Sequence, residues 1–119
     1  MNVEDLRIFC LSLKGVEETF PFDESTLVFK VMGKMFCLTG LERQPFACNV
    51  KCEPEKAIEL REEYAGVLPG YHMNKAHWNT LEFDDSFTDN QAKEWVVESY
   101  NLVVASLTKN IKLELEQLI

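Results

Sequence analysis

The first half of the chain alternates hydrophobic and polar residues in three short stretches. Residues 26–32 and 46–52 are rich in β-branched and aromatic side chains, and 35–39 continue the pattern between them. Gly33-Lys34 and the polar segment 40–45 are short enough to join consecutive antiparallel strands. The pattern therefore predicts a three-stranded antiparallel meander.

Strand alternation also predicts which side chains share a face. Lys30 lies opposite the Leu27 and Phe29 face of its strand, and Asn49 and Lys51 lie opposite the cysteine face of theirs. When these strands pair, the two lysines and Asn49 occupy one uncovered sheet face. Such a face suits an anion or a nucleic-acid backbone, and a solvated outer face explains the same pattern.

Apolar residues recur at helical spacing in three further segments, which are 2–15, 54–66 and 88–118. Asn2 and Pro54 suit the starts of the first two helices, and Thr88 forms a capping box with Gln91 at the start of the third. The third helix is long, and a break is expected near Lys109-Asn110.

Two remaining segments complete the expected fold. Residues 17–23 form an extended lead-in to the first strand, because Pro21 disfavours helix at the residue before it. Residues 77–83 form a further strand. Helices at both ends of the chain indicate one α+β domain over residues 1–119. We expect its antiparallel meander to be covered on one face by N-terminal, central and C-terminal helices.

Composition agrees with a single globular domain. The 119 residues are 46% hydrophobic and 27% charged. No stretch approaches the roughly 20 apolar residues of a membrane-spanning helix. The acidic start at residues 1–5 lacks the basic region of a signal peptide, so the cytoplasm is the expected compartment.

The cysteines and the absence of catalytic motifs limit the metal, cofactor and enzymatic functions that can be expected of the chain. Cys10, Cys37, Cys48 and Cys52 are expected to be buried thiols, since they lie in apolar or strand-like stretches. There is no Cys-x-x-Cys pair, so neither a metal nor a cofactor is expected. The chain also lacks a Gly-rich phosphate loop, a Gly-x-Ser-x-Gly motif and a His-Glu-x-x-His motif. We therefore do not expect an enzyme.

The formal net charge of −8 argues against strong, non-specific binding to nucleic acid. The charge is uneven, because residues 25–52 carry four basic residues against Glu42 alone. This basic middle is a candidate anion-facing surface. A solvated face of mixed charge is the alternative interpretation.

Residues 69–81 hold a Pro-Gly turn, two aromatics, both histidines, a lysine and two amides. Such density outside a regular helix predicts a side-chain cluster rather than a spacer. His72 and His77 are five residues apart, so neither helix nor strand spacing brings them together for a metal. Trp78 is expected in the core, although it and Tyr71 have rings that can stack on an unpaired base.

Four separated motifs follow one another along the chain. They are Glu17-x-x-Phe20-Pro21-Phe22, the hairpin Met32-Gly33-Lys34-Met35-Phe36, the strand end Val50-Lys51-Cys52 and the run from Pro69 to Trp78. In this order they resemble the MmcQ/YjbR family, and the resemblance covers nearly residues 1–110. The resemblance implies a CyaY-like α+β domain of small bacterial proteins. It also implies DNA binding through a "double wing" of β-hairpin loops that flank a helix.

The resemblance places one wing at the Met32-Gly33-Lys34 turn. Its phosphate contacts would be Lys30, Lys34 and Lys51, with Lys75 as a further cation. So few contacts predict weak binding to the DNA backbone that falls as salt rises.

Two alternatives remain open. The first is a module that binds a small anion or a protein partner through Lys51, His72, Asn74, Lys75 and His77. A closed pocket would favour this module, and an open ridge of lysines would favour nucleic acid. The second is an interaction protein that docks through its apolar tail, residues 111–119, although the leucines of this tail could instead close the core. A monomer or weak homodimer without membrane attachment is expected.

Overall fold

The computed structural model describes residues 1–70 and 73–119. The helices are α1 (Val3–Leu11), α2 (Pro54–Glu63), α3 (Asp89–Ala105) and α4 (Lys109–Gln117). The strands are β1 (Val16–Thr19), β2 (Thr26–Val31), β3 (Lys34–Gly40), β4 (Ala47–Lys51), β5 (Val67–Pro69) and β6 (Trp78–Glu82).

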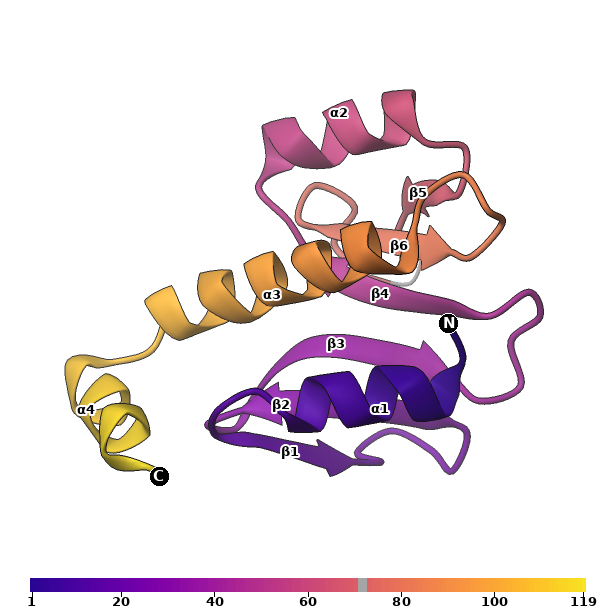
Figure 1. Ribbon diagram of the computed structural model, residues 1–119. Helices are drawn as coiled ribbons and strands as arrows, with labels where there is room; N and C mark the ends of the chain where they lie inside the picture. The colour runs from indigo at the N-terminus through magenta and orange to yellow at the C-terminus, as the bar shows by residue number, and fades with distance from the viewer. Residues whose placement is uncertain (71–72) are drawn as a thin grey trace.

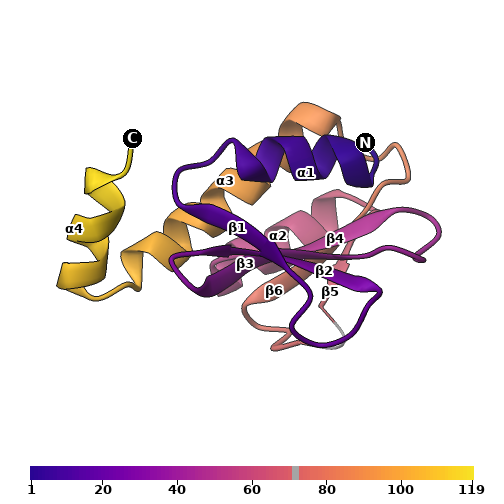
Figure 2. The same cartoon turned by 90° about the horizontal axis from the view of Figure 1, so that it is seen from below.

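All strands pair antiparallel in one sheet with the order β1-β2-β3-β4-β6-β5. Helices α1 and α3 lie on one side of this sheet, and α3 crosses β3 and β4 (Figures 1 and 2). Buried residues of α2 join the core on that side as well. The expected α+β fold, an antiparallel sheet covered by helices on one face, is confirmed.

A two-residue turn fixes the β2–β3 hairpin. Met32 and Gly33 both have positive φ, 48° and 85°. Such φ values at both positions are typical of a type I′ turn, whose twist matches that of the flanking strands. Lys34 is therefore the first residue of β3 rather than part of the turn.

Several boundaries differ from the sequence-based expectation. The first part of the lead-in expected over 17–23 belongs to a paired strand, because β1 pairs with β2 and Glu18 lies opposite Phe29. The short strand β5 was not predicted. The capping box of Thr88 and Gln91 is confirmed. The break expected near Lys109-Asn110 is present but lies slightly earlier, at residues 106–108 between α3 and α4.

The main core lies between the sheet and the helices, and its fully buried residues include Phe29, Phe36 and Leu81. All four cysteines are buried and free, as expected. A smaller cluster of Val28, Leu38 and Trp78 lies apart from the main core. The tail contributes Leu115 to the main core, whereas Leu113 and Leu118 stay exposed.

Among the described residues, no helix is both long and apolar enough to cross a bilayer.

Candidate functional site

The sheet face opposite the helices is hollowed into a cavity of about 830 Å³, which we call the open-face pocket. Its floor is a row of paired residues that crosses four strands. Leu38 pairs with Asn49, Asn49 with Thr80, and Thr80 with Leu68. Trp78, two residues before Thr80 on β6, also lines the pocket. The floor is therefore apolar at both ends and polar in the middle.

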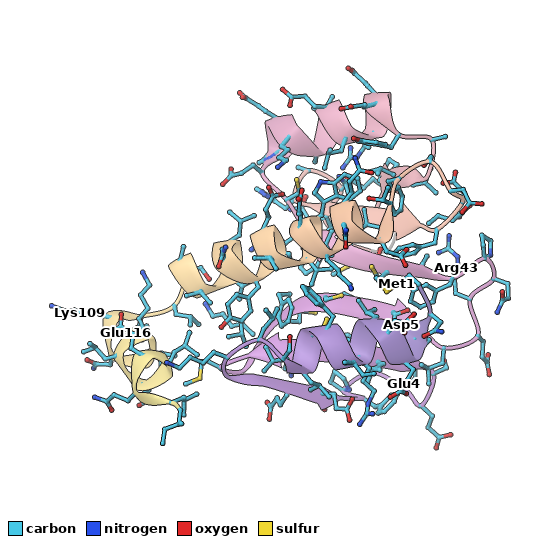
Figure 3. The ribbon with its side chains drawn as sticks, viewed as in Figure 1. Met1, Glu4, Asp5, Arg43, Lys109 and Glu116 are labelled. Carbon is cyan, nitrogen blue, oxygen red and sulfur yellow. The ribbon has the colours of Figure 1, made fainter. Side chains whose placement is uncertain are left out.

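Three strand connections form the walls of the pocket. Phe22 and Asp23 come from the β1–β2 connection, Arg43 from β3–β4, and Met73 and Asn74 from β5–β6. The β1–β2 connection and the described part of the β5–β6 connection lie on the side of the sheet away from α1 and α3 (Figure 2). Figure 3 shows Arg43 at the opposite end of the molecule from α4. The pocket is thus assembled from residues far apart in the sequence.

Among the described residues that line the pocket, the two charged side chains, Asp23 and Arg43, already have partners. The Asp23 carboxylate accepts backbone N–H bonds from Ser25 at 2.9 Å and Thr26 at 2.7 Å, and both hydroxyls also donate to it. These bonds, the Ser25 N–H first among them, lower the pKa of Asp23 below its ordinary value. Arg43 donates to Glu82 at 2.9 Å. The pocket therefore presents paired charges to a ligand.

The polar centre of the floor retains unused hydrogen-bonding capacity. The Thr80 hydroxyl is buried and donates to Oδ1 of Asn49 at 2.5 Å. Asn49 is half-buried, and its Nδ2 donates to no residue in the described part of the chain. Because Asn49 lines the pocket, its amide N–H groups are available to a bound molecule.

Arg61 on α2 fixes the segment that forms one wall. Its Nε donates to Oδ1 of the fully buried Asn79 at 2.7 Å. Its Nη2 donates to the backbone oxygens of Trp78, at 3.3 Å, and of Lys75. The Asn79 amide nitrogen in turn donates to the Ala57 oxygen at 3.3 Å. The helix layer thereby holds residues 75–79 in place beside the pocket.

The lysines predicted as phosphate contacts do not line this pocket. Strand alternation places Lys30 and Lys51 on the helix-free face, as expected, and both are half-buried. Lys34 is exposed at the start of β3. Lys75 is exposed in the β5–β6 connection. Arg43 is the only cation among the described residues that line the pocket.

Of the remaining predicted site residues that the structure describes, Asn74 lines the pocket and His77 does not. Asn74 lines the pocket, and its Oδ1 accepts the Ala76 N–H at 3.0 Å. His77 is exposed, and its backbone oxygen accepts the Cys52 N–H at 2.7 Å. His72 lies outside the described residues. The proposed cluster therefore contributes only Asn74 to the pocket among its described members. Trp78 is 8% exposed, which confirms its expected burial.

Sequence reasoning missed Phe22, Met35, Arg43 and Met73 in the pocket, and Arg61 behind it. One local signal could have indicated Phe22. It lies with Phe20 and Pro21 in a polar stretch, and an aromatic pair on such a loop is a common ligand contact. Phe22 is 65% exposed, which fits a residue on a rim rather than in a core. The residues described hold no group of three or more His, Cys, Asp or Glu placed to bind a metal.

Sequence comparisons relate this chain to bacterial proteins of similar length. The YjbR family model matches residues 11–102. The uncharacterised protein YbdF of Escherichia coli O157:H7 is 36% identical over 107 residues, which cover 89% of this chain and 87% of YbdF. The uncharacterised protein YjbR of Escherichia coli K12 is 33% identical over 119 residues, or 99% of this chain and all of YjbR.

Solved structures agree with that relationship. The Deinococcus radiodurans protein DR2400, described as a DUF419 domain, superposes with a TM-score of 0.91 at 39% identity and covers 97% of this chain and 88% of DR2400. A Pseudomonas syringae protein has the same fold, with a TM-score of 0.73 at 22% identity over 86% of this chain and 98% of its own. The chain therefore belongs to the YjbR family.

Proposed function

We propose that this protein is a non-enzymatic binding protein that takes a small, largely apolar ligand in the open-face pocket. One observation carries the proposal, which is a cavity of about 830 Å³ on the sheet face that the helices leave free. Ligand pockets for drug-sized molecules are typically about 300–1,000 Å³, mostly apolar, with a few placed polar groups. Leu38, Leu68 and Trp78 on the floor and Asn49 between them fit that description.

Exposed aromatic residues on the β1–β2 connection provide the test. Phe22 lines the pocket and is 65% exposed, so replacing it by alanine removes a wall with little effect on folding. We expect Phe22→Ala to weaken binding of Nile red, a neutral dye that fluoresces in apolar surroundings, by roughly three- to tenfold. A fluorescence titration measures the dissociation constant.

The matched control is Phe20→Ala. Phe20 is 49% exposed on the same loop and does not line the pocket. Equal loss of dye binding in the two variants would place the dye on the loop surface instead of in the pocket. Absence of dye binding to the unmodified protein would remove the support for a small-ligand function.

DNA binding is the second candidate, and one observation favours it. Lys30 and Lys51 share the helix-free face, with Lys34 exposed at one end of β3. These cations could contact phosphates beside the pocket, which would make binding weak and sensitive to salt. The net charge of −8 opposes such binding at a distance.

A fluorescent duplex is therefore expected to bind detectably only at low salt. Lys34→Ala combined with Lys51→Ala should weaken it, with a slope of log K against log salt of about −0.9 per phosphate neutralised. Lys109→Ala combined with Lys112→Ala, both on α4, removes the same charge elsewhere. If both double variants lose affinity equally, the attraction is a general charge effect and this candidate fails.

A further inference from the structure

The pocket floor restricts what its ligand can be. Apolar Leu38 and Leu68 lie at the two ends of the row, and the hydrogen-bonded pair of Asn49 and Thr80 lies between them. Thr80 is only 5% exposed, and its hydroxyl donates its hydrogen bond to Oδ1 of Asn49. Within this row of four residues, the only side-chain donors left unused are therefore the N–H groups of Asn49, while the Asn49 and Thr80 oxygens can still accept.

A donor in an apolar floor is most stable when a ligand satisfies it. Covering Asn49 with a ligand that lacks an acceptor removes water from its N–H groups without replacing the hydrogen bond. A ligand with an acceptor atom above the middle of the floor avoids that penalty. Selection through an unpaired polar group discriminates more strongly than selection by apolar contact alone.

The charges around the pocket favour a neutral ligand. Asp23 is held by four hydrogen bonds within its turn, and Arg43 is paired with Glu82. A charged ligand would have to compete for a partner that is already engaged. The pocket therefore offers no ready counter-ion in the part of the chain that the structure describes.

The walls and floor favour a flat ring. Phe22 and Trp78 supply two aromatic surfaces, and Met35 and Met73 supply two thioethers. Aromatic rings stack on other rings, and methionine sulfur makes favourable contacts with ring edges. A flat ring gains more from these surfaces than an aliphatic group of the same size does.

We propose that the open-face pocket binds a neutral, flat heteroaromatic ring, and that the Asn49 amide donates a hydrogen bond to an acceptor atom of that ring. This inference rests on the proposed small-ligand function and adds the chemical class of the ligand. Such a ring occurs in free small molecules and in the unpaired bases of a nucleic-acid strand.

Quinoline and naphthalene form the matched pair of probes, because they have nearly the same shape and differ by one ring nitrogen acceptor. We expect quinoline to bind roughly three- to tenfold more tightly, which is the net effect of one hydrogen bond. Asn49→Asp keeps the oxygen that accepts from Thr80 and replaces the amide donor. It should abolish the preference for quinoline when measured by chemical-shift titration at a pH at which both the new carboxylate and quinoline are unprotonated.

Asn74→Asp is the control variant. It adds the same charge to a residue that lines the same pocket, and keeps the oxygen that accepts the Ala76 N–H. The preference for quinoline should survive in this variant. Equal binding of the two probes by the unmodified protein, or a preference that Asn49→Asp leaves intact, would overturn the inference. In either case, binding of naphthalene and Nile red would leave the proposed function standing. If no probe binds, both ideas fail.

A second experiment distinguishes the two sources of the ring, which are a free small molecule and an unpaired base of a nucleic-acid strand. Adenosine and a short single-stranded oligodeoxyadenylate carry the same base. Similar affinities for the two would identify a free small molecule as the ligand. Oligonucleotide binding that is at least tenfold tighter and weakens with salt would identify a nucleic-acid strand.

Discussion

Replacing Arg61 by alanine is expected to lower the free energy of unfolding by about 3 kcal/mol, because a charge-assisted hydrogen bond to a buried acceptor is lost. The Nε group of Arg61 is the partner of Oδ1 of Asn79, whose side chain is fully buried. Without Arg61, that oxygen remains in the protein interior without a donor. Urea denaturation followed by circular dichroism measures the change.

The same variant should also weaken Nile red binding. Arg61 holds the backbone oxygens of Lys75 and Trp78, which belong to the segment beside Met73 and Asn74 in the pocket wall. Loss of these bonds frees the wall, so a ligand must order it on binding and affinity falls. We expect a larger loss of dye affinity than in Phe22→Ala.

Arg7→Ala is the control for Arg61→Ala. Arg7 also projects from a helix and pairs with Glu18 through two bonds of 2.5 and 2.6 Å, but both side chains remain partly exposed, at 40% and 30%. Exposed ion pairs contribute roughly 0–1 kcal/mol. If Arg61→Ala destabilised the protein no more than Arg7→Ala does, Arg61 would not hold the wall.

Replacing Ser99 by alanine is expected to destabilise the fold by a comparable amount, about 2–4 kcal/mol, because one buried and one partly buried backbone group lose their partner. Strands β3 and β4 pair only at Cys37 with Val50 and Leu38 with Asn49. Beyond that point the fully buried Ser99 hydroxyl donates to the Phe36 oxygen at 2.5 Å and accepts the Lys51 N–H at 2.8 Å. The Ser99 hydroxyl of α3 thus bridges β3 and β4 at a point where these strands do not pair directly.

Ser106→Ala provides the comparison for Ser99→Ala. The Ser106 hydroxyl donates to the Val103 oxygen within the last turn of α3, where no strand depends on it. Its removal should cost less than about 1 kcal/mol. Amide hydrogen exchange should show faster exchange at Lys51 in Ser99→Ala and no such change in Ser106→Ala. Equal stability of the two variants would show that Ser99 does not bridge the strands.

Local patterns predicted most of the fold. The alternation over residues 26–32 and 46–52, the turn signal of Gly33 and the capping box at Thr88 specify structure within a few residues, and each produced its element. The three-residue strand β5 escaped prediction because it has too few residues for a period and depends on pairing with β6. A strand of this length forms only because it pairs with the neighbouring strand.

The site could be predicted only in part, because it too depends on contacts between residues far apart in the sequence. Alternation placed Asn49 on the free face of the sheet, and that residue now lies at the centre of the pocket floor. Its partner Thr80 is 31 residues away in the sequence, and Arg61 reaches its acceptors from another helix. Proximity of this kind depends on tertiary packing, which no local spacing reports. The lysines were predicted as binding residues because charge can be read directly from a sequence, whereas a cavity cannot.

The methionines allow the most direct test of the claim that the open-face pocket is the binding site. Met35 and Met73 line the pocket, whereas Met1 and Met32 do not. We predict that naphthalene or quinoline, titrated into protein with ¹³C-labelled methionine methyl groups, shifts the Met35 and Met73 signals and leaves those of Met1 and Met32 in place. Shifts confined to Met1 or Met32, or no shift with either compound, would contradict the account.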